Sequence, residues 1–355
     1  MSCIVSVSGS PYEQGLTQGK ELKEVILRNL QRVDQKLQES RCDQKRYEDF
    51  VSRNLEMMKK NEPSLYEEME GIAQGSGLPF ADIVRLNIPA YFMTEYFNQE
   101  CSMIVARKNA TADGCTYVIK NRDMGTWIEQ CVLKRSYPDG SQIVEVNGAG
   151  IVTYPAGGIN GHGLCVTTTG FWSADLPPEI DRVDSSHIFL NIHLLLANCK
   201  TVDEVVAYAE QSPRMNGLNV LAADANAACV IEMTSNAVSV EYDQGKGVLF
   251  RTNHYRSDDF SHFNPEPALR PSTFHRSKRI ETLLEQQYGK IRFQDLLRIM
   301  SDHENGINSI CRHPQGEVQS RTVSCCLFVV EDLEVWTALG NPCEQLPSVR
   351  LSESK

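Results

Sequence analysis

The chain has 355 residues, of which 41% are hydrophobic and 23% charged, proportions typical of globular proteins. Its net charge of −11 argues against nucleic acid as a partner, because phosphate binding requires a basic surface. No stretch approaches the ~18–20 apolar residues of a membrane span, so we expect no membrane association. The first six residues lack the basic flank and apolar core of a secretory signal, and we expect a cytoplasmic location.

The first hundred residues are predicted to be mostly helical. A short strand over 3–8 precedes a Gly-Ser-Pro turn, and apolar residues at helical spacing then predict a helix over 12–37. A second helix is predicted over about 44–60. A third begins at Pro63, the favoured first helical position, and a fourth follows Pro79.

After Glu100 the pattern changes to strands joined by short turn signals such as Asp-Gly and Asp-Ala-Asn. The predicted strands cover residues 102–106, 116–121, 131–135, 142–146, 163–169, 219–224, 229–233, 238–242, 248–253, 322–330 and 334–339. Helical stretches are predicted at about 186–198, 202–211, 276–288 and 293–302. Short links imply antiparallel pairs, and this order of elements favours an α+β layered fold over βαβ repeats. The polar segment 256–270 is predicted to be a long surface loop.

The twelve cysteines are scattered along the chain and form no CxxC pair. We therefore expect no disulfide framework, no zinc or other metal, and no cofactor. Most of these thiols are expected to be buried as small hydrophobic side chains.

Cys101 stands apart because it lies where the helical pattern gives way to strands. Asn121 and Asp123 close the next predicted strand. A nucleophile at the start of a strand, facing such a pair, suggests a precursor that is cut between Glu100 and Cys101. The new α-amine of Cys101 would then serve as the base, since the pKa of such an amine is about 7.7–8.0.

Three further groups would complete such a site. Asp123 is the candidate for orienting the amine, and Asn253 for stabilising the oxyanion. Ser320 and Arg321, which enter a predicted strand, are candidates for ordering the cluster. Singly, each of these residues also fits a plain polar turn, a loop cap or a surface ion pair. A cysteine paired with one of the eight histidines is the alternative thiol mechanism, although no local signature of that kind surrounds any cysteine.

The combination of motifs resembles the acyl-coenzyme A:6-aminopenicillanic acid acyltransferases (isopenicillin N acyltransferases), a family of N-terminal nucleophile hydrolases. The resemblance runs over nearly the whole chain, and it is the order of several weak motifs that is specific. The motifs are the Gly-Ser-Pro-Tyr-Glu-Gln-Gly opening at 9–15 with Gly19, the helix at 66–75, Cys101-Ser102, Asn121-Arg122-Asp123, the turn at 158–164, Arg251-Thr252-Asn253-His254, Ser309-Ile310-Cys311-Arg312, Ser320-Arg321-Thr322 and Leu339-Gly340-Asn341-Pro342.

The resemblance implies a four-layer αββα sandwich and self-cleavage before Cys101. Residues 1–100 would form a helical propeptide or small subunit, and residues 101–355 the catalytic subunit, both in one compact domain. The processed subunits would stay associated. By the same resemblance, Cys101 is the nucleophile and Asp123 organises its amine. Asn253 donates to the oxyanion, while Ser320 and Arg321 support the site.

Two sequence features depart from the penicillin enzymes. Their cut lies between Gly and Cys, whereas here the pair is Glu100-Cys101, and a glycine lets the backbone twist more readily during an N-to-S acyl shift. A Gly-Cys pair does occur at Gly114-Cys115, but it leaves only five residues before Asn121, too few for a strand, a turn and a second strand. We therefore expect Cys101 to be the nucleophile and Asp113-Gly114 to be a turn.

Fold alone does not determine the reaction. The first expectation is hydrolysis of a small linear amide, either an N-acyl or a β-alanyl amine, through a thioester acyl-enzyme. The first alternative is acyl-CoA-dependent N-acyl transfer. The second is an unprocessed, catalytically silent relative that binds amides.

Overall fold

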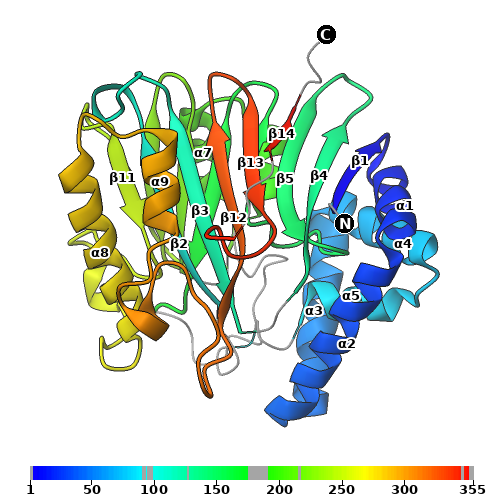
Figure 1. Ribbon diagram of the computed structural model, residues 1–355. Coiled ribbons are helices and arrows are strands. Elements are labelled where there is room, and N and C mark those ends of the chain that lie inside the picture. The colour runs from blue at the N-terminus through cyan, green and yellow to red at the C-terminus, as the bar shows by residue number, and fades with distance from the viewer. Residues whose placement is uncertain are drawn as a thin grey trace.

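Two β-sheets lie face to face between layers of helices in the computed structural model (Figure 1). The structure describes residues 3–89, 93, 99–125, 128–174, 191–214, 217–344 and 348–351. Sheet I has the order β1 (Ile4–Ser8), β4 (Gln130–Ser136), β5 (Gln142–Gly148), β6 (Gly157–Asn160), β7 (Cys165–Gly170), β8 (Leu218–Ala223), β9 (Ala228–Met233) and β10 (Val238–Tyr242). Sheet II has the order β11 (Val248–Arg251), β2 (Gln99–Ala106), β3 (Tyr117–Met124), β12 (Arg321–Val329), β13 (Glu334–Ala338) and β14 (Ser348–Arg350).

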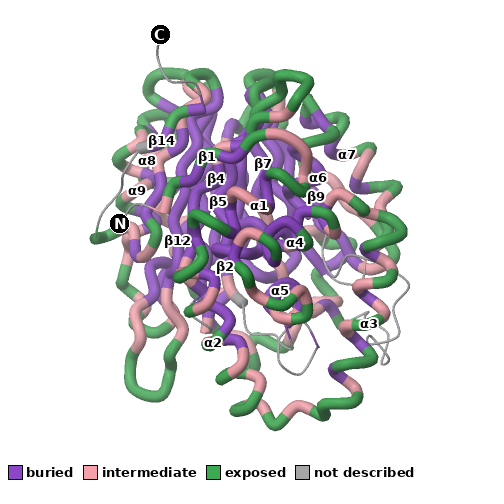
Figure 2. The backbone as a smooth tube through the Cα atoms, turned by 90° about the vertical axis from the view of Figure 1, so that its right-hand side faces the viewer, coloured by how far each residue is buried: buried purple, intermediate pink, exposed green. Residues whose placement is uncertain are grey.

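Three hydrophobic layers hold this sandwich together, and the strands they line are buried (Figure 2). Between the sheets, alternate residues such as Met103 and Val105 of β2 pack against sheet I. On the outside of sheet II, Ile104 belongs to the cluster that includes helices α8 (Pro271–Gln287) and α9 (Phe293–Met300). Helices α6 (Ile192–Asn198) and α7 (Val202–Gln211) cover sheet I in the same way. The expected αββα architecture is therefore confirmed.

The remaining helices gather beside the β1–β4 edge of sheet I (Figure 1). They are α1 (Pro11–Glu21), α2 (Lys23–Ser40), α3 (Gln44–Asn61), α4 (Pro63–Ser76) and α5 (Phe80–Asn87). The backbones of α1 and α4 touch: a Cβ on Gly15 would lie 2.1 Å from the Glu68 carbonyl oxygen, and one on Gly71 would lie 2.2 Å from that of Tyr12. Only glycine permits such an approach, which gives a physical reason for the glycines of the two N-terminal motifs.

One strand pairing and a network of buried ion pairs connect this helical part of the chain directly to sheet I. Strand β1 pairs with β4 in parallel, whereas the other pairs within the described part of the chain are antiparallel. Arg135 of β4 donates to Glu68 of α4 at 2.9 Å and to Glu145 of β5 at 2.8 Å, all three side chains being buried. Glu145 also contacts His193 of α6 at 2.9 Å. Residues before Glu100 thus contribute both backbone and charge to the same core as the residues after it.

Most predicted elements occur, with differences at their ends. The helix predicted over 12–37 is two helices separated at Leu22. Strands β2 and β3 are longer than predicted, so Cys101 lies inside β2 instead of before it. Helix α6 begins at Ile192, and the first part of the helix predicted from residue 186 lies outside the described residues. The predicted loop at 256–270 includes a short 3-10 helix, Ser261–Phe263, and the buried Phe260.

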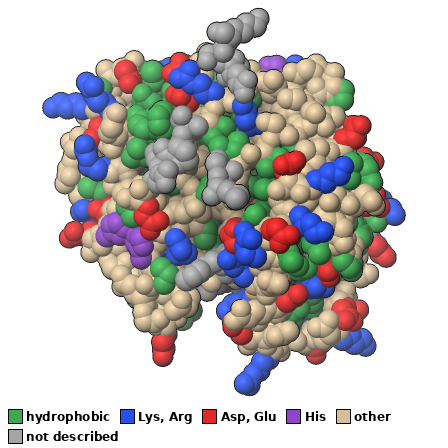
Figure 3. Space-filling view, turned by 45° about the vertical axis from the view of Figure 1, so that its right-hand side comes forward, with side chains coloured by type: hydrophobic (Ala, Val, Ile, Leu, Met, Phe, Trp, Pro, Cys, Tyr) green, Lys and Arg blue, Asp and Glu red, His purple; other side chains and the backbone are tan. Residues whose placement is uncertain are grey.

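Across the described residues, every helix is too short or too polar to traverse a bilayer. Acidic and basic side chains are interspersed over the face shown in Figure 3.

Candidate active site

Cys101 places its thiol and its backbone nitrogen in different surroundings. It pairs with Arg122 across β2 and β3, and it shares its face of the strand with Met103 and Val105. Because side chains alternate along a strand, the thiol points between the two sheets. Glu100 and Ser102 point the other way, toward α8.

The thiol lines a pocket between the sheets whose empty volume, with its open mouth, is ≈ 410 Å³. The described residues lining it are Cys101, Lys120, Arg122, Thr153, Tyr154, Pro155, Thr168, Gly170, Ile192 and Leu218. The only charged groups among them, Lys120 and Arg122, are both cationic. Buried Lys120 donates to the Ala156 carbonyl at 2.7 Å, and burial lowers its pKa, an effect that the nearby Cys101 opposes.

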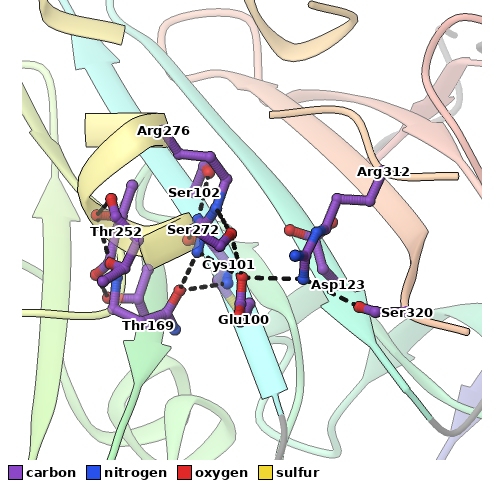
Figure 4. Close-up of polar contacts among 12 residues, drawn as sticks. Glu100, Cys101, Ser102, Asp123, Thr169, Thr252, Ser272, Arg276, Arg312 and Ser320 are labelled. Carbon is purple, nitrogen blue, oxygen red and sulfur yellow. Dashed lines mark hydrogen bonds and ion pairs between the residues drawn. The ribbon is translucent and has the colours of Figure 1, made fainter. Parts of the chain in front are cut away.

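On the opposite face of β2, Arg276 of α8 joins the backbone around Cys101 to its neighbours (Figure 4). Its guanidinium donates to the carbonyl oxygen of Cys101, and to the hydroxyl of Ser102 at 2.8 Å. It also donates to Oε2 of Glu100 at 3.0 Å and to Oδ1 of Asn253 at 2.9 Å. A fully buried arginine therefore fixes both sides of the Glu100–Cys101 peptide.

The Glu100 carboxylate is held firmly instead of projecting into solvent. Besides Arg276, its Oε2 contacts Arg312 at 2.9 Å and accepts from the Ser272 hydroxyl at 2.6 Å. Burial favours the neutral acid, but the two guanidinium charges and the Ser272 bond outweigh it and lower the pKa of Glu100. Arg312 in turn donates to the Ser320 hydroxyl at 3.2 Å, which brings Ser320 into the same cluster.

Asn253 contacts the backbone nitrogen of Cys101 directly. Its Oδ1 accepts from that nitrogen at 2.7 Å, and its Nδ2 donates to the carbonyl of pocket-lining Gly170 at 2.8 Å. The hydroxyl of Thr273, in the first turn of α8, fixes the Asn253 backbone at 2.7 Å. The amide thus presents an acceptor to the Cys101 nitrogen, while its donor lies on the pocket side.

Asp123 lies opposite Glu100 on β3 and is fully buried. Its Oδ1 accepts from the Thr322 hydroxyl at 2.6 Å, whereas its Oδ2 has no hydrogen-bond partner among the described residues. Burial raises the pKa of Asp123 to about 6, although the nearby Arg276 and Arg312 charges act against that rise. Asp123 therefore keeps one buried acceptor atom without a partner among the described residues, on the strand next to Cys101.

The structure brings four of the predicted residues into one connected cluster, namely Cys101, Asp123, Asn253 and Ser320. The fifth predicted residue, Arg321, donates a hydrogen bond to Oδ1 of Asn341 at 3.0 Å. Cys115 lies in the link before β3, at the far end of the β2–β3 pair from Cys101, and Gly114 has a φ of 79° there. That position fits the turn predicted at Asp113-Gly114.

Sequence reasoning missed the two arginines that hold Glu100 and the lysine beside the thiol. Arg276 was only the start of a predicted helix, Arg312 was only the end of a motif, and Lys120 only lay in a predicted strand. The alternation of Lys120 and Arg122 with Asn121 and Asp123 was the available signal, because it puts cations on one face of β3 and polar groups on the other.

The described residues do not support the cysteine–histidine alternative. Cys101 forms no hydrogen bond with a histidine in this part of the chain. The nearest motif histidine, His254, contacts the Thr273 hydroxyl at 2.9 Å, and burial lowers its pKa to about 3.

Comparisons with known proteins bear on this site. Residues 110–344 match the family described as acyl-coenzyme A:6-aminopenicillanic acid acyl-transferase. This range contains Asp123, Asn253 and Ser320 and begins after Cys101. A mutant of conjugated bile acid hydrolase from Clostridium perfringens is similar in structure, with 14% identity, coverage of 70% of this chain and 92% of that one, and a TM-score of 0.45. Penicillin V acylase from Agrobacterium tumefaciens has 15% identity, coverage of 67% and 83%, and a TM-score of 0.46.

Proposed function

Because the chain belongs to the acyl-coenzyme A:6-aminopenicillanic acid acyl-transferase family, we propose that it cleaves the C–N bond of a small linear amide with Cys101 as nucleophile. One observation carries this proposal. The Cys101 thiol lines the pocket, while its backbone nitrogen is held by Asn253 at 2.7 Å. Cleavage before Cys101 would turn that nitrogen into an amine already held next to the thiol.

Maturation would begin with attack of the Cys101 thiol on the Glu100 carbonyl carbon. The C–N bond breaks as the C–S bond forms, and the proton lost by the thiol goes to the Cys101 nitrogen. Water then cleaves the thioester, leaving a main-chain carboxylate at the new C-terminus, Glu100, and a free amine on Cys101. The contacts of Glu100 with Ser272, Arg276 and Arg312 support this step, because they hold the acyl side of the peptide in place.

Turnover would use the same atoms on an external amide. The amine of Cys101 takes the thiol proton, and the thiolate attacks the substrate carbonyl. Nδ2 of Asn253, which has a second N–H besides the one donated to Gly170, stabilises the oxyanion. The leaving amine takes the proton back, and water resolves the thioester. Asp123 holds the Cys101 amine in place, while Ser320 acts through Arg312.

The pocket favours one of the expected substrate classes. A β-alanyl group carries an ammonium, which the guanidinium of Arg122 would repel. An N-acyl amide with a neutral or anionic acyl group avoids that repulsion and can pack against Ile192 and Leu218. We therefore favour N-acyl amides. The name of the matched family supports acyl transfer from acyl-CoA to an amine as a second candidate, through the same thioester.

Two contacts suggest that the two fragments stay associated after cleavage. Strand β1 lies within sheet I, and Glu68 pairs with Arg135 in the interior. Residues 1–100 would therefore remain bound to residues 101–355 as a small subunit, the uncut chain being the zymogen.

Sequencing the N-termini of the purified protein tests the proposal. A terminus at Cys101 is expected in the wild type and in Cys115→Ala, and its absence is expected in Cys101→Ala. Hydrolysis of N-acyl and β-alanyl amides, with and without acyl-CoA, then ranks the substrate classes. An intact wild-type chain that does not react with a thiol-directed amide probe would instead identify an unprocessed, silent relative.

A further inference from the structure

Two cysteines and two histidines converge outside the candidate active site. They come from three segments: the turn after α9, the segment that leads to β12, and the turn after β13. All four potential ligand atoms lie within 4.8 Å of one another. We propose that this group, called the Cys2His2 cluster below, binds one zinc ion; its members are His303, Cys311, His313 and Cys343.

Three distances among Cys311, His313 and Cys343 are close to those of tetrahedral zinc. With Zn–S bonds of about 2.3 Å and Zn–N bonds of about 2.0–2.1 Å, tetrahedral geometry requires about 3.8 Å between two sulfurs and about 3.6 Å between sulfur and nitrogen. The sulfurs of Cys311 and Cys343 are 3.8 Å apart. Nε2 of His313 lies 3.4 Å from the Cys343 sulfur and 3.9 Å from that of Cys311. The rings of His303 and His313 have centroids 5.1 Å apart, and a ligand atom of His303 lies within 4.8 Å of the other three.

The surroundings of the cluster also suit a metal thiolate. Cys311 is buried, and its sulfur accepts from Nδ2 of the buried Asn341 at 3.3 Å. Hydrogen bonds of this kind orient ligands around metal sites. His303 and Cys343 are exposed, so an ion can enter from solvent. Two thiolates and two imidazoles form a closed donor set for zinc, which indicates a structural and not a catalytic ion.

Zinc bound at this cluster would hold the segment that contains Arg312 in place. Cys311 precedes Arg312 in the chain, and Asn341 links them, because its Nδ2 also donates to the Arg312 carbonyl at 2.6 Å. The Arg312 guanidinium is the one that holds Glu100. The ion would thus stabilise one wall of the site without contacting the thiol of Cys101.

This inference departs from the sequence-based expectation that no metal is bound. The four residues are separated by seven, one and twenty-nine positions, and none forms a CxxC pair. Only the fold brings them together. A disulfide between Cys311 and Cys343 is the competing arrangement, but their sulfurs stand well beyond the ~2.05 Å of an S–S bond.

Metal analysis of the untagged full-length protein, purified without chelators and under reducing conditions, tests the proposal. About one zinc per chain is expected, and replacement by Co²⁺ should give thiolate-to-cobalt absorption and the visible bands of a tetrahedral site. Cys343→Ser and His303→Asn change exposed positions, so both should fold and lose at least about tenfold in zinc content. Cys115→Ser, outside the cluster, should retain the zinc.

Three results would overturn the site. One is a folded wild-type chain that holds no zinc and gives no cobalt spectrum. Another is a Cys311–Cys343 disulfide in that zinc-free chain, found by peptide mass spectrometry. Retention of zinc in both exposed-ligand variants would likewise place the ion elsewhere.

Discussion

Glu100 and Asp123 lie directly opposite each other on β2 and β3, and the same two arginines act on both carboxyl groups. The pKa of Glu100 is lowered, because Ser272, Arg276 and Arg312 contact it directly. Burial instead raises the pKa of Asp123 to about 6, and the negative charge on Glu100 adds to that rise. In the uncut chain the arginines are therefore paired mainly with Glu100.

The first prediction concerns the role of Glu100 in maturation. Glu100→Gln removes the charge that faces Arg276 and Arg312, so the peptide before Cys101 loses its fixed position. Self-cleavage should slow by about tenfold or more, because small displacements of reacting groups cost that much. Gel electrophoresis of samples taken during and after expression measures the cut fraction.

Two further variants make this result specific. Glu129→Gln removes a carboxylate from the more exposed pairs with Arg28 and Arg32, and should mature at the wild-type rate. Glu100→Gly supplies the flexible residue of the penicillin enzymes but no carboxylate. If Glu100→Gly matures faster than the wild type, Glu100 obstructs the cut and its contacts do not assist it.

The second prediction is that Asp123 destabilises the uncut chain at neutral pH. Its pKa rises from 3.8 to about 6 on folding, so the folded state keeps a proton that the unfolded state releases. Stability is unaffected below pH 3.8, falls between these two values, and is lower by about 3 kcal/mol above the folded pKa. Asp123→Asn cannot ionise. In a Cys101→Ala background it should be more stable by up to about that amount at pH 8, and similar to its parent near pH 3.5.

Urea unfolding of the two proteins at both pH values measures this difference. Asp49→Asn, on the exposed side of α3, serves as the control and should change stability by less than about 0.5 kcal/mol at either pH. A destabilised Asp123→Asn at pH 8 would mean that Asp123 is ionised and paired in the uncut chain.

Local sequence patterns predicted most of the fold, but not its long-range pairing. Apolar spacing located most helices because amphipathic faces repeat along the chain. The break at Leu22 was missed, since the apolar pattern continues through it and only the φ of −111° separates α1 from α2. The parallel pairing of β1 with β4 joins residues more than a hundred positions apart, for which a single sequence has no local signal.

The same holds for the candidate site: local patterns predicted some of its residues, and long-range packing determined the others. Cys101, Asp123 and Asn253 were predicted because they sit at or next to the ends of predicted strands, within recognisable motifs. Arg276 was missed, because its position beside Cys101 depends on how α8 packs on sheet II. The Cys2His2 cluster was missed for the related reason that its ligands come from three separate segments.

The third prediction concerns the buried ion network that joins the segment before Cys101 to sheet I. Glu145 accepts from Arg135 at 2.8 Å and contacts His193 at 2.9 Å, and these charges outweigh burial and lower its pKa to about 2. This stability is present above pH 4.5 and is lost as the pH falls toward 2. Glu145→Gln leaves Arg135 short of a charge partner and should cost roughly 3–5 kcal/mol at pH 7, with a smaller cost near pH 3.

Chemical denaturation at the two pH values provides the measurement, again in the Cys101→Ala background. Glu334→Gln, which breaks the more exposed pair with Arg350, is the matched control and should cost less than about 1 kcal/mol. An equal cost of Glu145→Gln at pH 7 and pH 3 would contradict the assigned charge pairing.

The fourth prediction concerns Lys120, which lies in the pocket with the Cys101 thiol and donates to the Ala156 carbonyl at 2.7 Å. Its amino group, as a hydrogen-bond donor or a cation, can stabilise the negative charge that develops during attack on a substrate carbonyl. Lys120→Met keeps the length of the side chain and removes that group, so kcat should fall by about a hundredfold.

Steady-state kinetics on an N-acyl amide measures this loss. Lys134→Met, on the neighbouring sheet, controls for the loss of a lysine elsewhere. An unchanged kcat in Lys120→Met would mean that Lys120 takes no part in the reaction.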